Sequence, residues 1–130
     1  RITQKLTATI KVPESYTTGT EITMLNYVFK DGISNNYAMQ TVTTLIRPSL
    51  DAIDSTANQF TSATSDLQAS TAKLLTEFAT SLTTGAGEIN GQAVGPGDLL
   101  KVELSRVAPS GTETTDDVKF IPDSTEVSFG

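Results

Sequence analysis

The sequence predicts an all-β protein, an antiparallel sandwich or barrel of about seven or eight strands. Three observations predict this fold class: apolar and polar residues alternate with a period of two, turn residues separate the alternating segments, and threonine is abundant. The 130 residues include 22 Thr and 12 Ser. The branched Cβ of threonine suits a pleated strand. We expect residues 1–130 to form a single domain that is large enough to fold without disulfides.

Residues 2–12 are the first predicted strand. Its apolar residues share one face: Leu6, Ala8, Ile10 and Val12. Lysines and threonines occupy the other face, an alternation that is typical of a half-buried strand. Pro13 ends the strand. We also expect residues 1–12 to act as an N-terminal arm that can pair with the exposed sheet edge of a neighbouring protein.

The second and third strands are predicted at residues 21–30 and 37–47. The second is apolar on both faces, which is typical of a central or interface strand. Asp31-Gly32 lies between the two strands and predicts a hairpin turn. Pro48 closes the third strand.

The stretch at residues 48–70 is less regular than the rest of the chain. Small polar residues predict a long loop at 48–66, and loops of that length in a compact domain are often functional. A short helix near 62–70 is a second interpretation. In residues 67–82 the apolar residues fit either a helical stripe, formed by Leu67, Leu74, Phe78 and Leu82, or one face of a strand, and the threonine content favours a strand at 72–82.

The last third of the chain returns to strands. Glycine and proline predict a turn-rich loop at residues 83–98. A strand follows at 99–107, with Leu100, Val102 and Leu104 on its core face. Two short strands are predicted at 117–121 and 126–129.

Composition excludes several classes of function. The chain has no cysteine, histidine or tryptophan, so it lacks the ligands of zinc fingers and haem and the residues of Cys–His or Ser–His–Asp nucleophile systems. A net charge of −6 argues against unassisted binding to nucleic acid or to an anionic membrane. We therefore expect no cofactor, no catalytic activity, and neither nucleic acid nor membrane as a partner.

Carboxylates are the remaining candidates for chemistry. Asp51 with Asp54, and the acidic residues at 116–126, could offer oxygens to Ca²⁺, but neither group has the spacing of an EF-hand loop. Glu77, Glu103 and Glu126 lie on predicted strands, as a glycosidase pair would require, but no tryptophan platform accompanies them. We interpret all of these carboxylates as surface charge.

Charge is unevenly distributed along the sequence. Residues 1–50 carry five Lys/Arg and three Asp/Glu, residues 51–82 carry one and four, and residues 83–130 carry three and eight. One interpretation is solvated surface throughout. The alternative is that the basic surface of one subunit meets the acidic surface of the next, which fixes the register of an assembly.

Three segments resemble segments of jelly-roll structural proteins of tailed bacteriophage virions, and they occur in the same order as in that family. Ile89–Arg106 resembles a glycine-rich loop followed by a "GDLL" strand that ends in arginine. Val12–Ile22 resembles the beginning of the family's domain. Asp116–Phe120 and Glu126–Phe129 resemble its final pair of strands. The stretch at 48–70 departs from the family pattern.

This resemblance implies a jelly-roll β-sandwich without enzymatic activity. It implies a capsid decoration (cement) protein, a homotrimer on the virion surface with the major capsid protein as partner. The candidate contact regions are the N-terminal strand, the loop at 48–66 and the tail after Val127. The candidate contact residues are Lys5, Lys11, Asp51, Asp54 and Arg106. Arg106 is expected on the core face of its strand near the strand's end, where it could reach Asp116 or Asp117 or extend to the rim of the sandwich.

Two other functions stay open at this stage. One is a carbohydrate- or receptor-binding β-sandwich of a tail or head fibre, in which tyrosines such as Tyr16, Tyr27 and Tyr37 stack on sugars. Tyr27 lies on the apolar strand at 21–30, and we expect it in the core. The other is a surface pilus subunit that donates its N-terminal strand to the next subunit.

Overall fold

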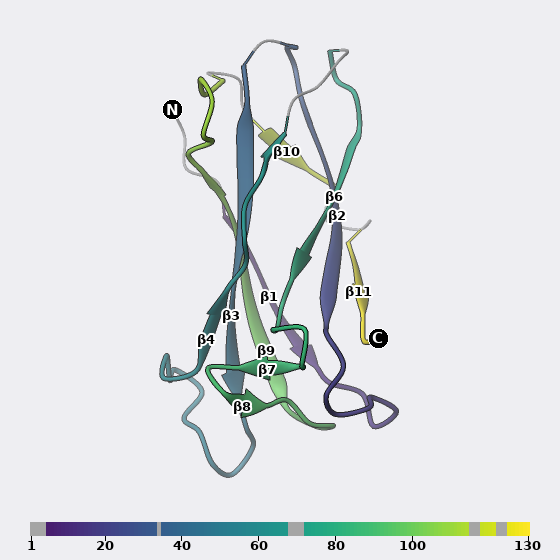
Figure 1. Cartoon of the computed structure of the whole chain (residues 1–130), viewed down its shortest axis with the longest axis vertical. Coiled ribbons are helices and arrows are strands. Elements are labelled where there is room, and N and C mark those ends of the chain that lie inside the picture. Colours follow the sequence, from purple (N-terminus) through teal and green to yellow (C-terminus); the bar gives the residue numbers. More distant parts are fainter. Residues whose placement is uncertain (1–4, 34, 68–71, 115–117, 122–124) are drawn as a thin grey trace.

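The structure is a computed structural model that describes residues 5–33, 35–67, 72–114, 118–121 and 125–130. These residues form eleven β-strands and no helix. The strands make two antiparallel sheets that pack face to face, together with a small hairpin (Figure 1). The predicted all-β sandwich is therefore confirmed. The described residues contain no helix long and apolar enough to span a membrane.

The first sheet is built around two long strands. Its order is β1 (Lys5–Lys11), β9 (Leu99–Val107), β3 (Tyr37–Ile46) and β4 (Gln59–Thr61), and β5 (Asp66–Leu67) also pairs with β3. All of these pairings are antiparallel. Strand β1 therefore lies at one edge of the sheet, and β9 lies between β1 and β3 over residues 99–105.

The second sheet is centred on β2 (Thr23–Lys30). Strand β6 (Thr76–Ser81) pairs with one edge of β2. Two short strands, β10 (Val118–Phe120) and β11 (Glu126–Ser128), pair with successive parts of the other edge. The central position predicted for the second strand is thus confirmed.

The core lies between the two sheets. In β9 every second side chain is buried: Leu100, Val102 and Leu104 are at most 3% exposed. They lie beside Leu45, Thr43 and Thr41 of β3. The second sheet contributes Met24 and Val28 from β2 to the same cluster. The predicted core face of residues 99–107 is therefore correct.

The hairpin predicted at Asp31-Gly32 is wrong. Strand β2 pairs with β6, β10 and β11, whereas β3 pairs with β9, β4 and β5. The connection at residues 31–36 therefore crosses from one sheet to the other. A turn signal predicts only that the chain reverses direction. Which strand pairs with which depends on how the apolar faces pack.

The loop predicted at 48–66 is shorter in the structure, because β4 and the first residue of β5 fall inside it. These strands are too short to show an alternating pattern. Residues 62–67 are not helical, and the rest of the segment predicted as a possible helix lies outside the described residues. The strand predicted at 72–82 is present as β6, limited to Thr76–Ser81.

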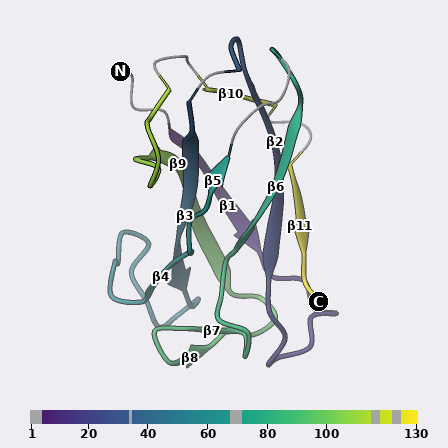
Figure 2. The same ribbon diagram turned by 45° about the horizontal axis from the view of Figure 1, so that its top comes forward.

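A hairpin interrupts the glycine-rich segment at 83–98. Strands β7 (Glu88–Ile89) and β8 (Gln92–Ala93) pair across Asn90-Gly91. Both turn residues have positive φ, 51° and 74°, which is the requirement of a two-residue type I′ turn and explains the Asn-Gly sequence. This hairpin and the loop at residues 47–58 lie at the same end of the molecule (Figures 1 and 2).

Candidate protein-binding edge

Strand β1 is the most exposed of the long strands. Among the described residues it pairs only with β9, so its other edge carries no partner strand. Leu6 and Ile10 are half-buried and Ala8 is exposed, although all three face the second sheet, beside the buried side chains of β9. The second sheet therefore does not fully cover the inner face of β1.

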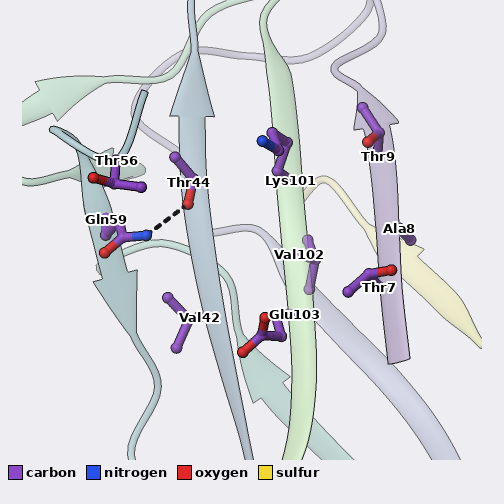
Figure 3. Close-up of a pocket in the computed structure, with 10 residues that line it drawn as sticks. All are labelled: Thr7, Ala8, Thr9, Val42, Thr44, Thr56, Gln59, Lys101, Val102 and Glu103. Carbon is purple, nitrogen blue, oxygen red and sulfur yellow. Dashed lines mark hydrogen bonds between the residues drawn. The ribbon is translucent and has the colours of Figure 1, made fainter. Parts of the chain in front are cut away.

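A groove of about 580 Å³ crosses the outer face of the first sheet, which is the face turned away from the second sheet. Figure 3 shows its lining, in which Thr7 and Thr9 of β1 lie beside Lys101 and Glu103 of β9. The far side of the groove is formed by β3, β4 and the loop before β4. There Gln59 Nε2 donates a hydrogen bond to Thr44 Oγ1 at 3.0 Å. Seven of the ten lining residues are polar.

A second groove, of about 220 Å³, opens between β1 and the second sheet. Its lining is mainly apolar and consists of Leu6, Thr7, Ala8, Met24, Val102, Leu104 and Thr125. Three residues line both grooves: Thr7, Ala8 and Val102. Strand β1 therefore has a polar groove on one face and an apolar groove on the other. Side chains of a strand alternate between exactly these two faces.

Lysines mark both ends of β1. Lys5 Nζ lies 3.5 Å from Glu103 Oε1, and both side chains are largely exposed. Lys11 is exposed at the other end. Lysines on an edge strand disfavour pairing with another basic strand and favour an acidic one. Lys5 and Lys11, two of the predicted contact residues, thus both belong to the free edge.

The loop at residues 47–58 is held by an ion pair at its base. Arg47 Nε and Nη2 donate to Asp51 Oδ2 and Oδ1 at 2.9 and 3.1 Å, and the Arg47 backbone N–H donates to Oδ2 at 2.8 Å. The hydrogen bonds between the two side chains lower the pKa of Asp51 and raise the pKa of Arg47. Asp51, predicted as a subunit contact, therefore shapes its own loop.

The same loop presents two large aliphatic side chains to solvent. Leu50 is 68% exposed and Ile53 is 62% exposed. Lys101 Nζ donates to the carbonyl oxygen of Ile53 at 2.8 Å and anchors the loop to β9. Asp54, another predicted contact residue, is exposed beside Ile53. Aliphatic side chains fixed on an anchored loop are suited to contact another protein, because little conformational freedom is lost on binding.

Arg106 lies inside the sandwich. It is only 7% exposed. Its Nη2 donates to the carbonyl oxygen of Thr114 at 2.7 Å, and its Nε lies 3.6 Å from Glu113 Oε2. A buried guanidinium with these partners connects β9 to residues 113–114 instead of presenting itself to a neighbour. The partners suggested from the sequence, Asp116 and Asp117, lie outside the described residues.

The acidic residues form no cluster suited to a metal within the described ranges: no group of three or more His, Cys, Asp or Glu comes together there. Glu103 lies on the outer face of the first sheet, whereas Glu77 and Glu126 lie on the outer face of the second. Asp116, Asp117 and Asp123 lie outside the described residues.

The tyrosines occupy different environments. Tyr16 and Tyr37 are buried, at 6% and 0% exposure. Tyr27, predicted in the core, lies half-buried on the outer face of β2, because β2 directs its odd-numbered residues outward. Its hydroxyl donates to Glu77 Oε2 at 3.0 Å, and this hydrogen bond raises the pKa of Tyr27. Phe29 is on the same face, with Lys119 Nζ 5.9 Å from its ring centroid.

Sequence patterns identified β1 but not the residues that line its outer groove. Thr44, Gln59, Lys101 and Glu103 are outward residues of three strands, and only the pairing of those strands places them together. Comparison with known proteins found no matching family model, no matching curated protein and no matching solved structure.

Proposed function

We propose that this chain is a non-enzymatic structural protein of a phage virion, a capsid decoration protein that binds between subunits of the assembled head. The observation that carries the proposal is the free edge of β1, flanked by one polar and one apolar groove. An unpaired strand edge is a ready-made template for another chain. The resemblance to jelly-roll virion proteins supports the identity of that chain as the major capsid protein.

The mechanism is thermodynamic linkage. A protein that binds the assembled shell, and not its dissociated subunits, stabilises the shell by RT ln(1 + [L]/Kd), where [L] is its free concentration and Kd is its dissociation constant for the shell. No chemical step is required, only surface burial at the contact. In this proposal the chain is a homotrimer at the capsid surface, and its strands follow jelly-roll connectivity.

The contact surface in this proposal has two parts. The first is β1, with Lys5 and Lys11 at its ends. The second is the anchored loop, with Leu50, Ile53 and Asp54 exposed. Exposed apolar side chains with a polar rim are typical of a surface that contacts another protein.

The test is occupancy on virus particles that lack the protein. Purified full-length chain, a deletion of residues 1–11 and Ala8→Lys are mixed with the particles and sedimented with them. We expect both changes to reduce occupancy at least about tenfold. The deletion removes contacts that are spread over a whole strand, and Ala8→Lys places a charge over the apolar groove. Removing a single exposed charge elsewhere on the surface should matter less, because such a charge contributes under about 1 kcal/mol.

Ala79→Lys is the matched control. Ala79 is exposed on β6, the edge strand of the other sheet, so the charge change is identical. Equal occupancy for the parent, the deletion and the two lysine variants would show that β1 is not the contact surface. If particles release their contents at the same temperature with and without the protein, the protein does not stabilise the shell.

A carbohydrate-binding function is the second candidate, and the outer face of β2 favours it. Half-buried Tyr27 and Phe29 lie side by side there with the carboxylate of Glu77, and aromatic faces with nearby carboxylates suit a sugar ring. Binding to an array of bacterial surface glycans tests it. Tyr27→Ala should abolish any binding that is found, and a Tyr27→Ala variant that binds as well as the parent would exclude this face.

A further inference from the structure

We propose that β1 accepts an extended segment of its partner as an added strand of the first sheet, and that this segment alternates aliphatic residues with polar residues and has an acidic residue at each end. The proposal rests on the proposed function, because it specifies the chemistry of the segment that binds β1. The backbone supplies the first argument. The side of β1 away from β9 carries N–H and C=O groups without a strand partner among the described residues, and an added strand satisfies them.

The apolar groove specifies one face of the added strand. Leu6, Ala8 and Ile10 point toward the second sheet but are not buried, whereas the β9 side chains beside them are at most 3% exposed. A strand paired with the free edge places every second side chain next to this row and over the apolar groove. Aliphatic side chains at these positions complete the burial that β1 lacks.

The opposite face of β1 specifies the remaining positions. Lys5, Thr7, Thr9 and Lys11 all point outward, with the two threonines lining the polar groove. An added antiparallel strand places polar residues beside the threonines and one residue beside each lysine. Carboxylates fit beside the lysines, because opposite charges across a strand pair stabilise it and like charges oppose it.

A second copy of β1 does not fit this description. Antiparallel pairing of β1 with itself, in the register that overlaps all seven residues, centres on Ala8 and places Lys5 opposite Lys11 at both ends. That arrangement brings four ammonium groups together in two like-charged pairs. The two lysines therefore select against self-pairing and for an acidic segment of another chain.

The experiment tethers a designed segment to the full chain. The sequence Glu-Val-Thr-Val-Thr-Val-Glu is fused before Arg1 through a flexible Gly/Ser linker, so that it can fold back antiparallel to β1 at an effective concentration in the millimolar range. We expect amide exchange in β1 to slow at least about tenfold and the melting temperature to rise by about 3 °C or more.

Two sets of controls make the result specific. Replacement of both glutamates by lysine should remove most of the gain, and proline in place of the central valine should abolish it. In the chain itself, Ala8→Lys should abolish the gain by placing a charge over the apolar groove, whereas Ala79→Lys should retain it.

Unchanged exchange and melting in the tethered protein would overturn strand addition. Equal gains from the glutamate and lysine versions would overturn the acidic specificity. Another outcome is that the untethered chain forms a dimer and that Ala8→Lys abolishes this dimer. This result would identify a second copy of the chain as the occupant of the β1 edge and would likewise overturn the proposal. If instead Ala8→Lys lowers occupancy on particles while the tethered segment does not protect β1, the attachment function stands and strand addition fails.

Discussion

Strands β1 and β9 have the same alternating pattern but opposite environments. Leu100, Val102 and Leu104 of β9 are at most 3% exposed, whereas Leu6 and Ile10 of β1 are half-buried and Ala8 is exposed. Each β1 residue lies directly beside its β9 counterpart and faces the same way. Alternation therefore identifies the face to which a side chain belongs. The position of the strand in the sheet decides whether the other sheet covers that face.

The physical reason is the number of neighbours. Strand β9 has β1 on one edge, β3 on the other, and the second sheet across the core. Within the described residues, strand β1 has one neighbouring strand and only partial cover from the second sheet. The centre of the sheet therefore contributes most of the burial, whereas the edge leaves part of its apolar surface open.

The largest effect is expected at the centre of the sheet. Leu104→Asp buries a carboxylate without a partner among apolar side chains, and we expect it to cost at least about 4 kcal/mol, which is comparable to the total stability of many domains. Denaturant unfolding followed by circular dichroism measures it. Ser105→Asp is the control, because Ser105 is adjacent in sequence but faces outward opposite Lys5. Coincident unfolding of Leu104→Asp and the parent would place this strand at the surface.

The second largest effect is expected at the end of the same strand. Arg106→Met removes the donor to the Thr114 carbonyl and the charge beside Glu113, and we expect a loss of about 3 kcal/mol, because the partly buried Glu113 carboxylate loses the charge of a buried guanidinium. Thermal unfolding measures it. A loss below about 1 kcal/mol would show that Arg106 is not needed to hold residues 113–114 against β9.

A smaller effect is expected from acid. The pKa of Asp66 is lowered chiefly by backbone N–H donors from Ser110 and Gly111, and the pKa of Asp51 is lowered chiefly by Arg47. A carboxylate whose pKa is lower in the folded state stabilises the fold above its ordinary pKa of 3.8. That contribution is lost as the pH falls from this value through the lowered one.

The measurement is a series of melting temperatures from pH 6 to pH 2, with carboxyl titration followed by NMR. We expect the melting temperature to fall below about pH 4 and the decline to be shallower in an Asp51→Asn, Asp66→Asn double variant. An acid transition of the same steepness in parent and double variant would assign the pH dependence to other groups.

The smallest effect on stability is expected at the edge strand. Ala8 is already exposed, so Ala8→Lys should change the free energy of unfolding by no more than about 0.5 kcal/mol. The same substitution is expected to give a large loss of occupancy on particles. Ala79→Lys should match it in stability and leave occupancy unchanged. A marked destabilisation by Ala8→Lys would mean that β1 belongs to the core as fully as β9 does.

Local sequence patterns predict the all-β class and the core face of residues 99–107, but not the core face of the second strand, where Tyr27 lies on the outer side. The alternation in residues 99–107 placed Leu100, Val102 and Leu104 correctly, because the period of a strand is a local property of the backbone. Local signals also placed β2, β3 and β6 within a few residues of their observed bounds. The short β7–β8 hairpin was missed even though Asn90-Gly91 is a local turn signal.

Only the tertiary structure decided which strands pair and which faces remain open. The Asp31-Gly32 turn connects two sheets instead of two paired strands, and the partners of Arg106 on the core face of β9 are Thr114 and Glu113. The exposed edge of β1 and its two grooves likewise depend on β9, β3 and β2, which are distant in sequence. Pairing and burial depend on residues far apart in the chain, and a pattern that repeats every two residues contains no information about them.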